Sequence, residues 1–152
     1  MLKEGSTAPA FKTTDGEGRS VSLKDFRGQR VVLYFYPKDD TPGCTKEACS
    51  FRDAFDEFKK AGIKLLGIST DNEASHQKFA RKFNLQFTLL TDTDHAIAEK
   101  YGSYGEKKFM GRTYMGVHRK TFLIDEKGKI KRVFEKVKPD DHAQEVLKAF
   151  AE

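Results

Sequence analysis

A short apolar strand that runs into a proline-rich turn and a helix start constrains this chain more than any other stretch. Val31 to Tyr36, VVLYFY, is a β-branched and aromatic run short enough to be a buried central strand. Pro37 ends the strand, because proline has no backbone N–H to donate to a sheet. Thr41 is a good helix N-cap, and Pro42 suits the first helical position. The sequence therefore predicts a strand, a shaped turn and a helix that begins near Pro42.

The cysteines, Cys44 and Cys49, both follow this turn. Cys44 comes three residues after the cap, among backbone N–H groups of the first helical turn that have no partner in the helix. A helix N-terminus and cationic neighbours favour the thiolate, which is the nucleophilic form of cysteine. Thr41 is placed to donate its hydroxyl to the sulfur. A free cysteine is most often a small buried apolar residue, but the surrounding Pro, Thr and Gly indicate a shaped turn and a reactive thiol.

These residues also carry a resemblance to a known family. Pro37, Thr41 and Cys44 form the pattern PxxxTxxC, which resembles the active-site signature of peroxiredoxins. The longer run DTPGCTKEAC is similar to the bacterioferritin comigratory protein or peroxiredoxin Q subfamily, and the likeness extends to GVHRKTFLID at residues 116–125. The resemblance implies a thioredoxin fold with an added N-terminal hairpin. It also implies a thiol-dependent peroxidase that reduces hydrogen peroxide and organic hydroperoxides.

The resemblance assigns a role to each matched residue. Cys44 matches the peroxidatic cysteine, which attacks a peroxide oxygen and becomes a sulfenic acid. Thr41 would hold the thiolate and the peroxide by hydrogen bonds, and Pro37 would shield the site from water. Arg119 matches the arginine that stabilises the thiolate and the leaving oxygen; the alternative is a solvated arginine at a strand edge. Glu47 matches a glutamate that orients this arginine, or is an ordinary exposed helix residue.

Cys49 matches the resolving cysteine of an atypical two-cysteine enzyme. Residues five apart in an ideal helix have Cα atoms about 8.6 Å apart, whereas a disulfide needs roughly 7 Å or less. If Cys49 resolves the sulfenic acid, the helix must therefore unwind locally in each cycle. The alternative is an inert thiol on a one-cysteine enzyme. The resemblance further implies recycling by thioredoxin or a similar dithiol reductant.

The remaining polar residues are weaker candidates. No histidine lies at metal-ligand spacing with a cysteine, so neither a zinc site nor any other cofactor is expected. His118 adjoins Arg119 and is interpreted as a loop residue. Asp39 and Asp40 are interpreted as turn residues, because a fixed negative charge beside Cys44 would disfavour its thiolate. The four histidines are His76, His95, His118 and His142.

The rest of the chain predicts one α/β domain over residues 1–152, with a central mixed sheet flanked by helices. The order strand, helix, strand, helix argues for parallel strands joined by right-handed crossovers, and the lack of a CxxC motif separates the chain from thioredoxin itself. A small hairpin is expected around residues 13–20, between Phe11 and residues 21–23, then a polar loop or single helical turn at 24–30. The further predicted strands are 63–69, 87–90, 120–125 and 130–137; the predicted helices are 42–61 with Gly62 as C-cap, 73–83, 96–101 and 141–150; residues 102–116 are predicted to be a long surface loop.

Composition and charge exclude several classes of protein. The net charge of +5 is scattered, so no nucleic-acid partner is expected. The first residues contain no apolar signal region, and no segment approaches the roughly 18 apolar residues that span a bilayer. We therefore expect a cytoplasmic protein without a membrane partner, in which the two cysteines are redox-active rather than structural. The subfamily resemblance further implies a monomer. Two alternatives to a peroxidase are a redox-signalling or thiol-transfer module of the same fold, and a nucleic-acid-binding protein.

Overall fold

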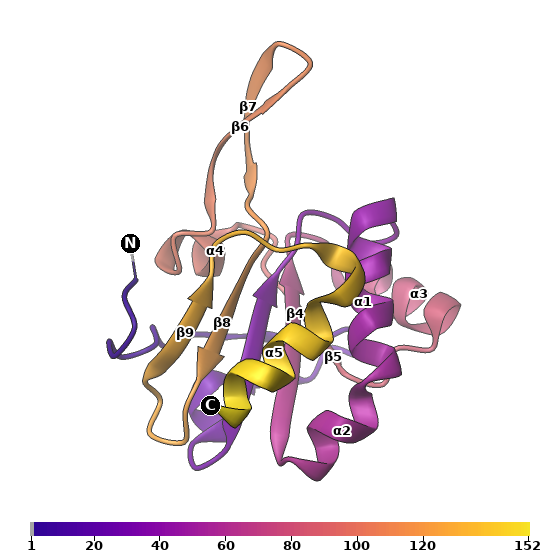
Figure 1. Cartoon of the computed structure of the whole chain (residues 1–152). Coiled ribbons are helices and arrows are strands. Elements are labelled where there is room, and N and C mark those ends of the chain that lie inside the picture. The colour runs from indigo at the N-terminus through magenta and orange to yellow at the C-terminus, as the bar shows by residue number, and fades with distance from the viewer. Residues whose placement is uncertain (1) are drawn as a thin grey trace.

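The computed structural model describes residues 2–152 and is built on a five-stranded mixed sheet in the order β5-β4-β3-β8-β9 (Figure 1). β3 pairs in parallel with β4, and β4 in parallel with β5, whereas β8 is antiparallel to both β3 and β9. The predicted mixed sheet is therefore confirmed. The five strands are β3 (Arg30–Phe35), β4 (Ile63–Ser69), β5 (Thr88–Thr91), β8 (Lys120–Ile124) and β9 (Ile130–Phe134).

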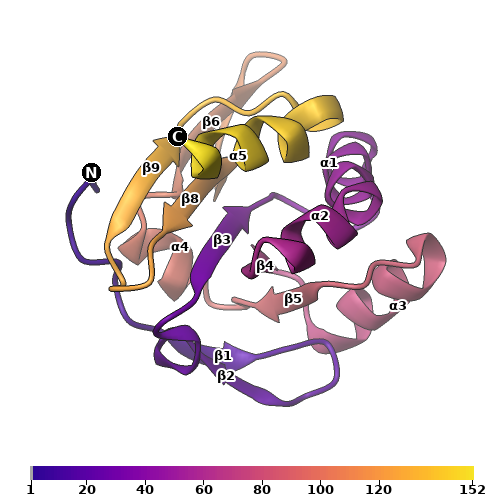
Figure 2. The same cartoon turned by 60° about the horizontal axis from the view of Figure 1, so that its bottom comes forward.

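The central strand β3 is buried on both faces, because successive side chains alternate between two cores. Val32 and Tyr34 point into a core formed with α1, α2, α3 and α5. Leu33 and Phe35 point into a second core, which α4 and the N-terminal hairpin cover (Figure 2). The result is the predicted arrangement of a central sheet flanked by helices. The helices are α1 (Pro42–Asp53), α2 (Phe55–Lys60), α3 (Glu73–Phe83), α4 (Ala96–Lys100) and α5 (His142–Ala151), which follows the short 3-10 turn η2 (Pro139–Asp141).

The predicted helix over residues 42–61 is wrong in one respect, since the structure breaks it at Ala54. This residue has φ −99° and ψ 6°, and its carbonyl accepts from the N–H of Glu57 at 3.0 Å, a tighter turn than an α-helix makes. Phe51 and Phe58, on either side of the break, pack in the same core, with ring centroids 5.8 Å apart. The helical spacing of apolar residues continues across Ala54, so it did not indicate the break. Gly62 follows the end of α2 at φ +73°, as predicted for a terminating glycine.

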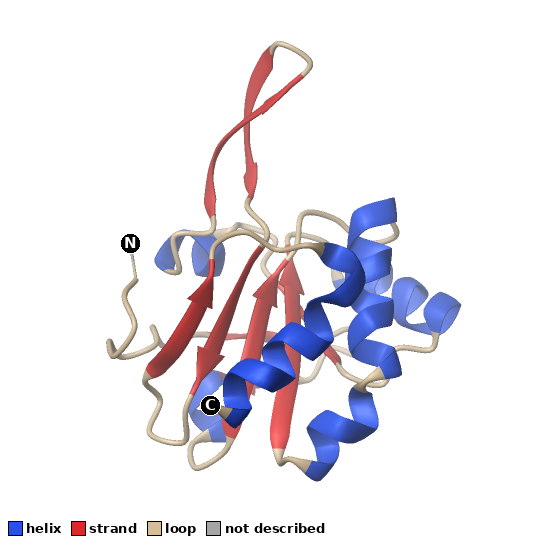
Figure 3. Cartoon of the chain, in the orientation of Figure 1, coloured by secondary structure: helices blue, strands red, loops and turns tan. Residues whose placement is uncertain are grey.

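The predicted surface loop over residues 102–116 is also wrong. The structure has a hairpin there, β6 (Tyr104–Phe109) and β7 (Arg112–Val117), which stands clear of the sheet (Figures 1 and 3). Met110 and Gly111 form its turn with φ +50° and +79°, and positive φ at both positions suits the twist of a two-residue hairpin. Neither face of this ribbon packs on the core over most of its length, so the sequence lacks the apolar alternation that marks a half-buried strand.

The N-terminal hairpin was predicted correctly. β1 (Lys12–Thr14) and β2 (Ser20–Ser22) are antiparallel, and the single turn η1 (Leu23–Phe26) follows them. The last strand, β9, is shorter than the predicted strand over residues 130–137. In the part of the chain that the structure describes, no helix has the length and apolar character needed to cross a membrane.

Candidate active site

Cys44 lies where the central strand gives way to the first long helix. β3 ends at Phe35, the chain turns at one end of the sheet, and α1 begins at Pro42 (Figure 1). Thr41 is the N-cap residue, with extended backbone angles of φ −103° and ψ 156°. Its carbonyl accepts the first helical hydrogen bond, from the N–H of Thr45 at 2.8 Å. Cys44 is therefore the third residue of the helix, as the sequence predicts, and it is only 2% exposed.

Arg119 joins Cys44 to Glu47 through one guanidinium group. Nη2 donates to Cys44 Sγ at 3.2 Å, and Nη1 donates to Glu47 Oε1 at 2.6 Å. Arg119 stands between β7 and β8, 75 positions after Cys44. Gly43 leaves room for it, since a Cβ at that position would lie 3.2 Å from Nη2. The structure thus brings together the three residues that the resemblance grouped, and neither Arg119 nor Glu47 is the solvated side chain of the alternative interpretation.

The charges at the site are coupled. Burial raises the pKa of Glu47 from 4.5 to about 7, although Arg119 pulls it in the opposite direction. Burial disfavours the Arg119 cation, but Glu47 and Cys44 stabilise it more, so the pKa of Arg119 is raised. Burial and the charge of Arg119 lower the pKa of nearby Lys107, against the influence of Cys44. Among the described residues, Glu47 Oε2 has no hydrogen-bond partner. The sulfur of Cys44 therefore faces the cationic guanidinium of Arg119.

The hydroxyl of Thr41 does not donate to the sulfur of Cys44, as the sequence predicted it would. Its hydroxyl donates to the carbonyl of Lys38 at 2.8 Å. Because a hydroxyl has one proton, this bond leaves none for Cys44 in the state described, and the predicted Thr41–Cys44 hydrogen bond is replaced by a bond that closes the turn. Pro37 is half-buried at the start of that turn.

Cys49 lies in the same unbroken helix as Cys44. α1 runs from Pro42 to Asp53, and both thiols are free. Cys44 is buried, whereas Cys49 is partly exposed. The two sulfurs therefore belong to positions that an intact helix holds too far apart for a disulfide.

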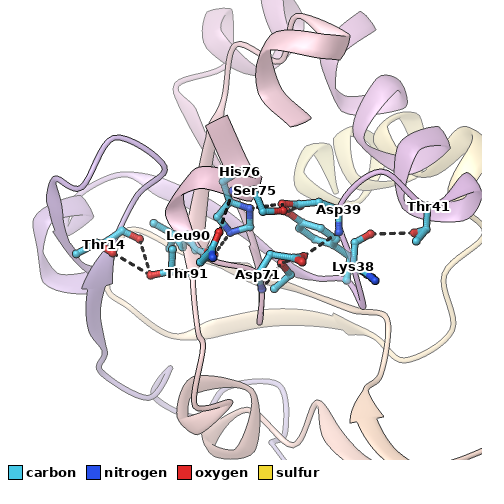
Figure 4. A network of polar contacts seen from close by, with 12 residues as sticks. Thr14, Lys38, Asp39, Thr41, Asp71, Ser75, His76, Leu90 and Thr91 are labelled. Atoms are coloured by element: carbon cyan, nitrogen blue, oxygen red, sulfur yellow. Dashed lines mark hydrogen bonds and ion pairs between the residues drawn. The ribbon is translucent and has the colours of Figure 1, made fainter. Parts of the chain in front are cut away.

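A buried polar network fixes the turn that precedes α1 (Figure 4). Asp39 is its centre: Oδ1 accepts from the hydroxyl of Tyr36 at 2.6 Å, Oδ2 accepts from Ser75 Oγ at 2.8 Å, and Nδ1 of His76 lies 2.7 Å from Oδ2. Nε2 of His76 lies 2.8 Å from the carbonyl oxygen of Leu90, which can only accept. The network ties the turn to α3 and β5, so it sets where α1 begins.

Sequence reasoning missed this network. It interpreted Asp39 as a turn residue and found no partner for His76, whose contact with Asp39 spans 37 positions. Short-range spacing carries no signal of such a pair. Asp40, by contrast, is the exposed turn residue that was expected, and it pairs with Lys82 at 2.8 Å.

Comparisons with known proteins show similarity over most of the chain. The model of the AhpC/TSA family matches residues 5–133 of this chain. The chain is 54% identical over 146 residues to peroxiredoxin Bcp of Escherichia coli strain K12, covering 96% of this chain and 94% of the relative. It is 44% identical over 146 residues to peroxiredoxin Bcp of Bacillus subtilis strain 168, covering 96% and 93%.

Two solved structures are similar over nearly their whole length. A cysteine mutant of Xylella fastidiosa PrxQ has a TM-score of 0.93 at 32% identity, covering 100% of this chain and 99% of that one. The bacterioferritin comigratory protein of Xanthomonas campestris, described with an alkyl peroxide reduction activity, has a TM-score of 0.88 at 37% identity, covering 93% and 90%. The predicted thioredoxin-like fold is thereby confirmed.

Proposed function

This chain belongs to the AhpC/TSA family as a peroxiredoxin, a thiol-dependent peroxidase, and we propose that Cys44 is its peroxidatic residue and Cys49 its resolving residue. The contact of Arg119 with both Cys44 Sγ and Glu47 Oε1 carries this proposal. The proposed substrates are hydrogen peroxide and organic hydroperoxides. The alkyl peroxide reduction described for the Xanthomonas campestris relative supports the second class.

In the first step the Cys44 thiolate attacks one oxygen of the peroxide. A sulfur electron pair forms the S–O bond, the O–O bond breaks, and the leaving oxygen takes a proton to become water or an alcohol. Arg119 stabilises both the thiolate and the charge that develops on the oxygens. Glu47 holds the guanidinium in place. Thr41 can serve the peroxide once its hydroxyl rotates away from the Lys38 carbonyl, and Pro37 limits the approach of water.

In the second step the sulfur of Cys49 attacks the sulfenic acid, a disulfide forms, and water leaves. In an ideal helix the two Cα atoms would be about 8.6 Å apart, more than a disulfide allows. The first turns of α1 must therefore unwind before the bond forms. A thioredoxin-like dithiol protein would then return Cys44 and Cys49 to thiols. We propose that the enzyme acts as a single-domain monomer in the cytoplasm.

A stopped-flow measurement at micromolar peroxide tests this function. Wild type should consume its reactive thiol within milliseconds to seconds, the Cys49→Ser variant should do so at the same initial rate, and Cys44→Ser should be unreactive. A redox-signalling or thiol-transfer module of the same fold would react no faster than a free thiol. A wild-type rate equal to that of a free cysteine would therefore contradict the proposal.

A further inference from the structure

The β6–β7 hairpin carries exposed apolar side chains at its turn and along β7. Phe109 is 66% exposed, Met110 87%, Tyr114 47% and Met115 59%. Within residues 2–152, these are the large apolar side chains that stand exposed. The tip projects far beyond the sheet, and no other helix or strand of residues 2–152 covers it (Figure 1). By the strand register, Phe109 and Tyr114 lie on one face of the ribbon and Met115 on the other. Exposed apolar side chains grouped in this way mark sites of interaction.

The same ribbon is basic. It carries Lys107, Lys108 and Arg112 against a single acid, Glu106. Arg112 lies opposite Phe109 in the strand register, so cation and aromatic ring share a face of the ribbon. Aromatic residues, methionine and arginine are the side chains enriched in protein interfaces. The composition therefore favours a protein partner with an apolar surface and acidic residues around it.

The base of the hairpin adjoins the active site. β7 ends at Val117, and His118 and Arg119 follow at once. A Cβ on Gly105 would lie 3.3 Å from Nε2 of His118, so the base of the ribbon packs against the residue beside Arg119. The ribbon also leaves the end of the sheet at which α1 begins (Figure 1). The base of the hairpin and Cys44 therefore lie at the same end of the sheet.

The reach of the hairpin matches a small globular partner. A six-residue strand extends about 20 Å, and a domain of about 100 residues has a radius of gyration of about 13 Å. A domain of that size seated on the active site would lie against the tip as well. A small-molecule reductant would touch neither Phe109 nor Met110.

From these observations we infer that the β6–β7 hairpin is the docking arm for the protein dithiol that reduces the Cys44–Cys49 disulfide. This inference rests on the proposed function. The partner is a small dithiol protein whose active-site face is apolar and bordered by acidic residues. One partner thiolate attacks a sulfur of the disulfide to form a mixed disulfide, and the second partner thiol displaces it. The partner leaves as a disulfide, and Cys44 and Cys49 return as thiols.

Turnover of hydrogen peroxide with two reductants tests the docking arm. The first reductant is an acidic thioredoxin kept reduced by its own reductase; the second is dithiothreitol, which has no docking surface. The hairpin variant is Lys108→Glu with Arg112→Glu. The control is Lys59→Glu with Lys60→Glu, the same change of charge on exposed residues of α2, at the other end of the molecule (Figure 1).

The measured quantity is the ratio of kcat/KM with thioredoxin to kcat/KM with dithiothreitol. The hairpin variant should lower this ratio about tenfold or more, chiefly by raising KM for thioredoxin. The α2 control should change that ratio by about twofold or less, because salt screens distant charges. A second variant, Phe109→Ser with Met110→Ser, should also raise KM for thioredoxin, and this rise should persist at high salt because it removes apolar contacts.

Equal effects of the hairpin and α2 variants would overturn the inference, as would an equal loss with both reductants. Sedimentation that shows a dimer dissociated by the hairpin variant would assign the tip to a second copy of the chain and would also overturn it. A wild type that fails to reduce peroxide even with dithiothreitol would remove the proposed function itself. If turnover with dithiothreitol is normal and the hairpin variant reacts with thioredoxin as well as wild type does, the docking inference is wrong and the proposed function stands.

Discussion

Replacing Glu47 with glutamine measures what a buried carboxylate at the active site costs the fold. The side chain is fully buried, and burial raises its pKa from 4.5 to about 7 despite the pairing with Arg119. The difference, 7 minus 4.5, is about 2.5 pH units. At about 1.36 kcal/mol for each unit, it corresponds to about 3 kcal/mol of free energy of unfolding.

The sign follows from the protons bound in each state. Between pH 4.5 and about 7 the native protein keeps a proton on Glu47 that the unfolded chain has released. The contribution of Glu47 to the free energy of unfolding of wild type is therefore highest below pH 4.5. It falls as the pH rises from 4.5 to about 7 and is constant above about 7. The side chain of glutamine does not bind or release a proton in this pH range. The Glu47→Gln variant should thus gain about 3 kcal/mol relative to wild type across this window.

Urea unfolding of both proteins under reducing conditions, at the two ends of the window, gives this difference directly. Titrating groups that do not interact with Glu47 cancel in the comparison. Glu57→Gln, on the exposed side of α2, controls for the loss of a carboxylate as such. A gain of about 3 kcal/mol corresponds to a rise in Tm of about 6–12 °C for a chain of this length. Parallel pH profiles for wild type and Glu47→Gln would refute the reasoning, and a relative loss for the variant would mean that the ion pair outweighs burial.

Three further predictions concern the same end of the molecule. Arg119→Lys lacks the fork that reaches two atoms at once, so the stopped-flow rate with peroxide should fall about 10²- to 10³-fold; a rate within a few-fold of wild type would contradict the role of the fork. Asp39→Leu should cost about 3–5 kcal/mol in urea unfolding because it strands His76, and the double variant with His76→Leu should cost less than the sum of the single variants; additive costs would mean that the pair is not coupled. Oxidation should remove hydrogen-exchange protection from the amides of α1 in wild type but not in Cys49→Ser; protection that survives in oxidised wild type would rule out unwinding.

Most of the fold was predictable because its strands and helices bury one face or both. β3, β4 and α3 lie where apolar runs and periodicity placed them. The β6–β7 hairpin was missed for the opposite reason, since an exposed ribbon leaves no burial pattern in the sequence. The break at Ala54 was missed because apolar spacing is the same on both sides of it.

The active site was predictable to the extent that its residues lie in recognisable motifs. The helix cap and the turn before it identify Cys44. A motif identifies Arg119, but the sequence does not show that Arg119 lies close to Cys44 in space. The hydroxyl of Thr41 donates to the carbonyl of Lys38 and not to Cys44, a partner that the folded turn determines and the motif does not. The contact between Asp39 and His76 depends on how α3 packs beside the turn, which local pattern does not determine.

The most direct test of the central claim is the mass and free-thiol count after one equivalent of hydrogen peroxide. In wild type both thiols and the mass of two hydrogen atoms should be lost within seconds. The Cys49→Ser variant should stop as a sulfenic acid, one oxygen heavier, and Cys44→Ser should not react. If Cys44→Ser reacts at the wild-type rate, or if wild type keeps both thiols, then the assignment of Cys44 and Cys49 to peroxide reduction is contradicted.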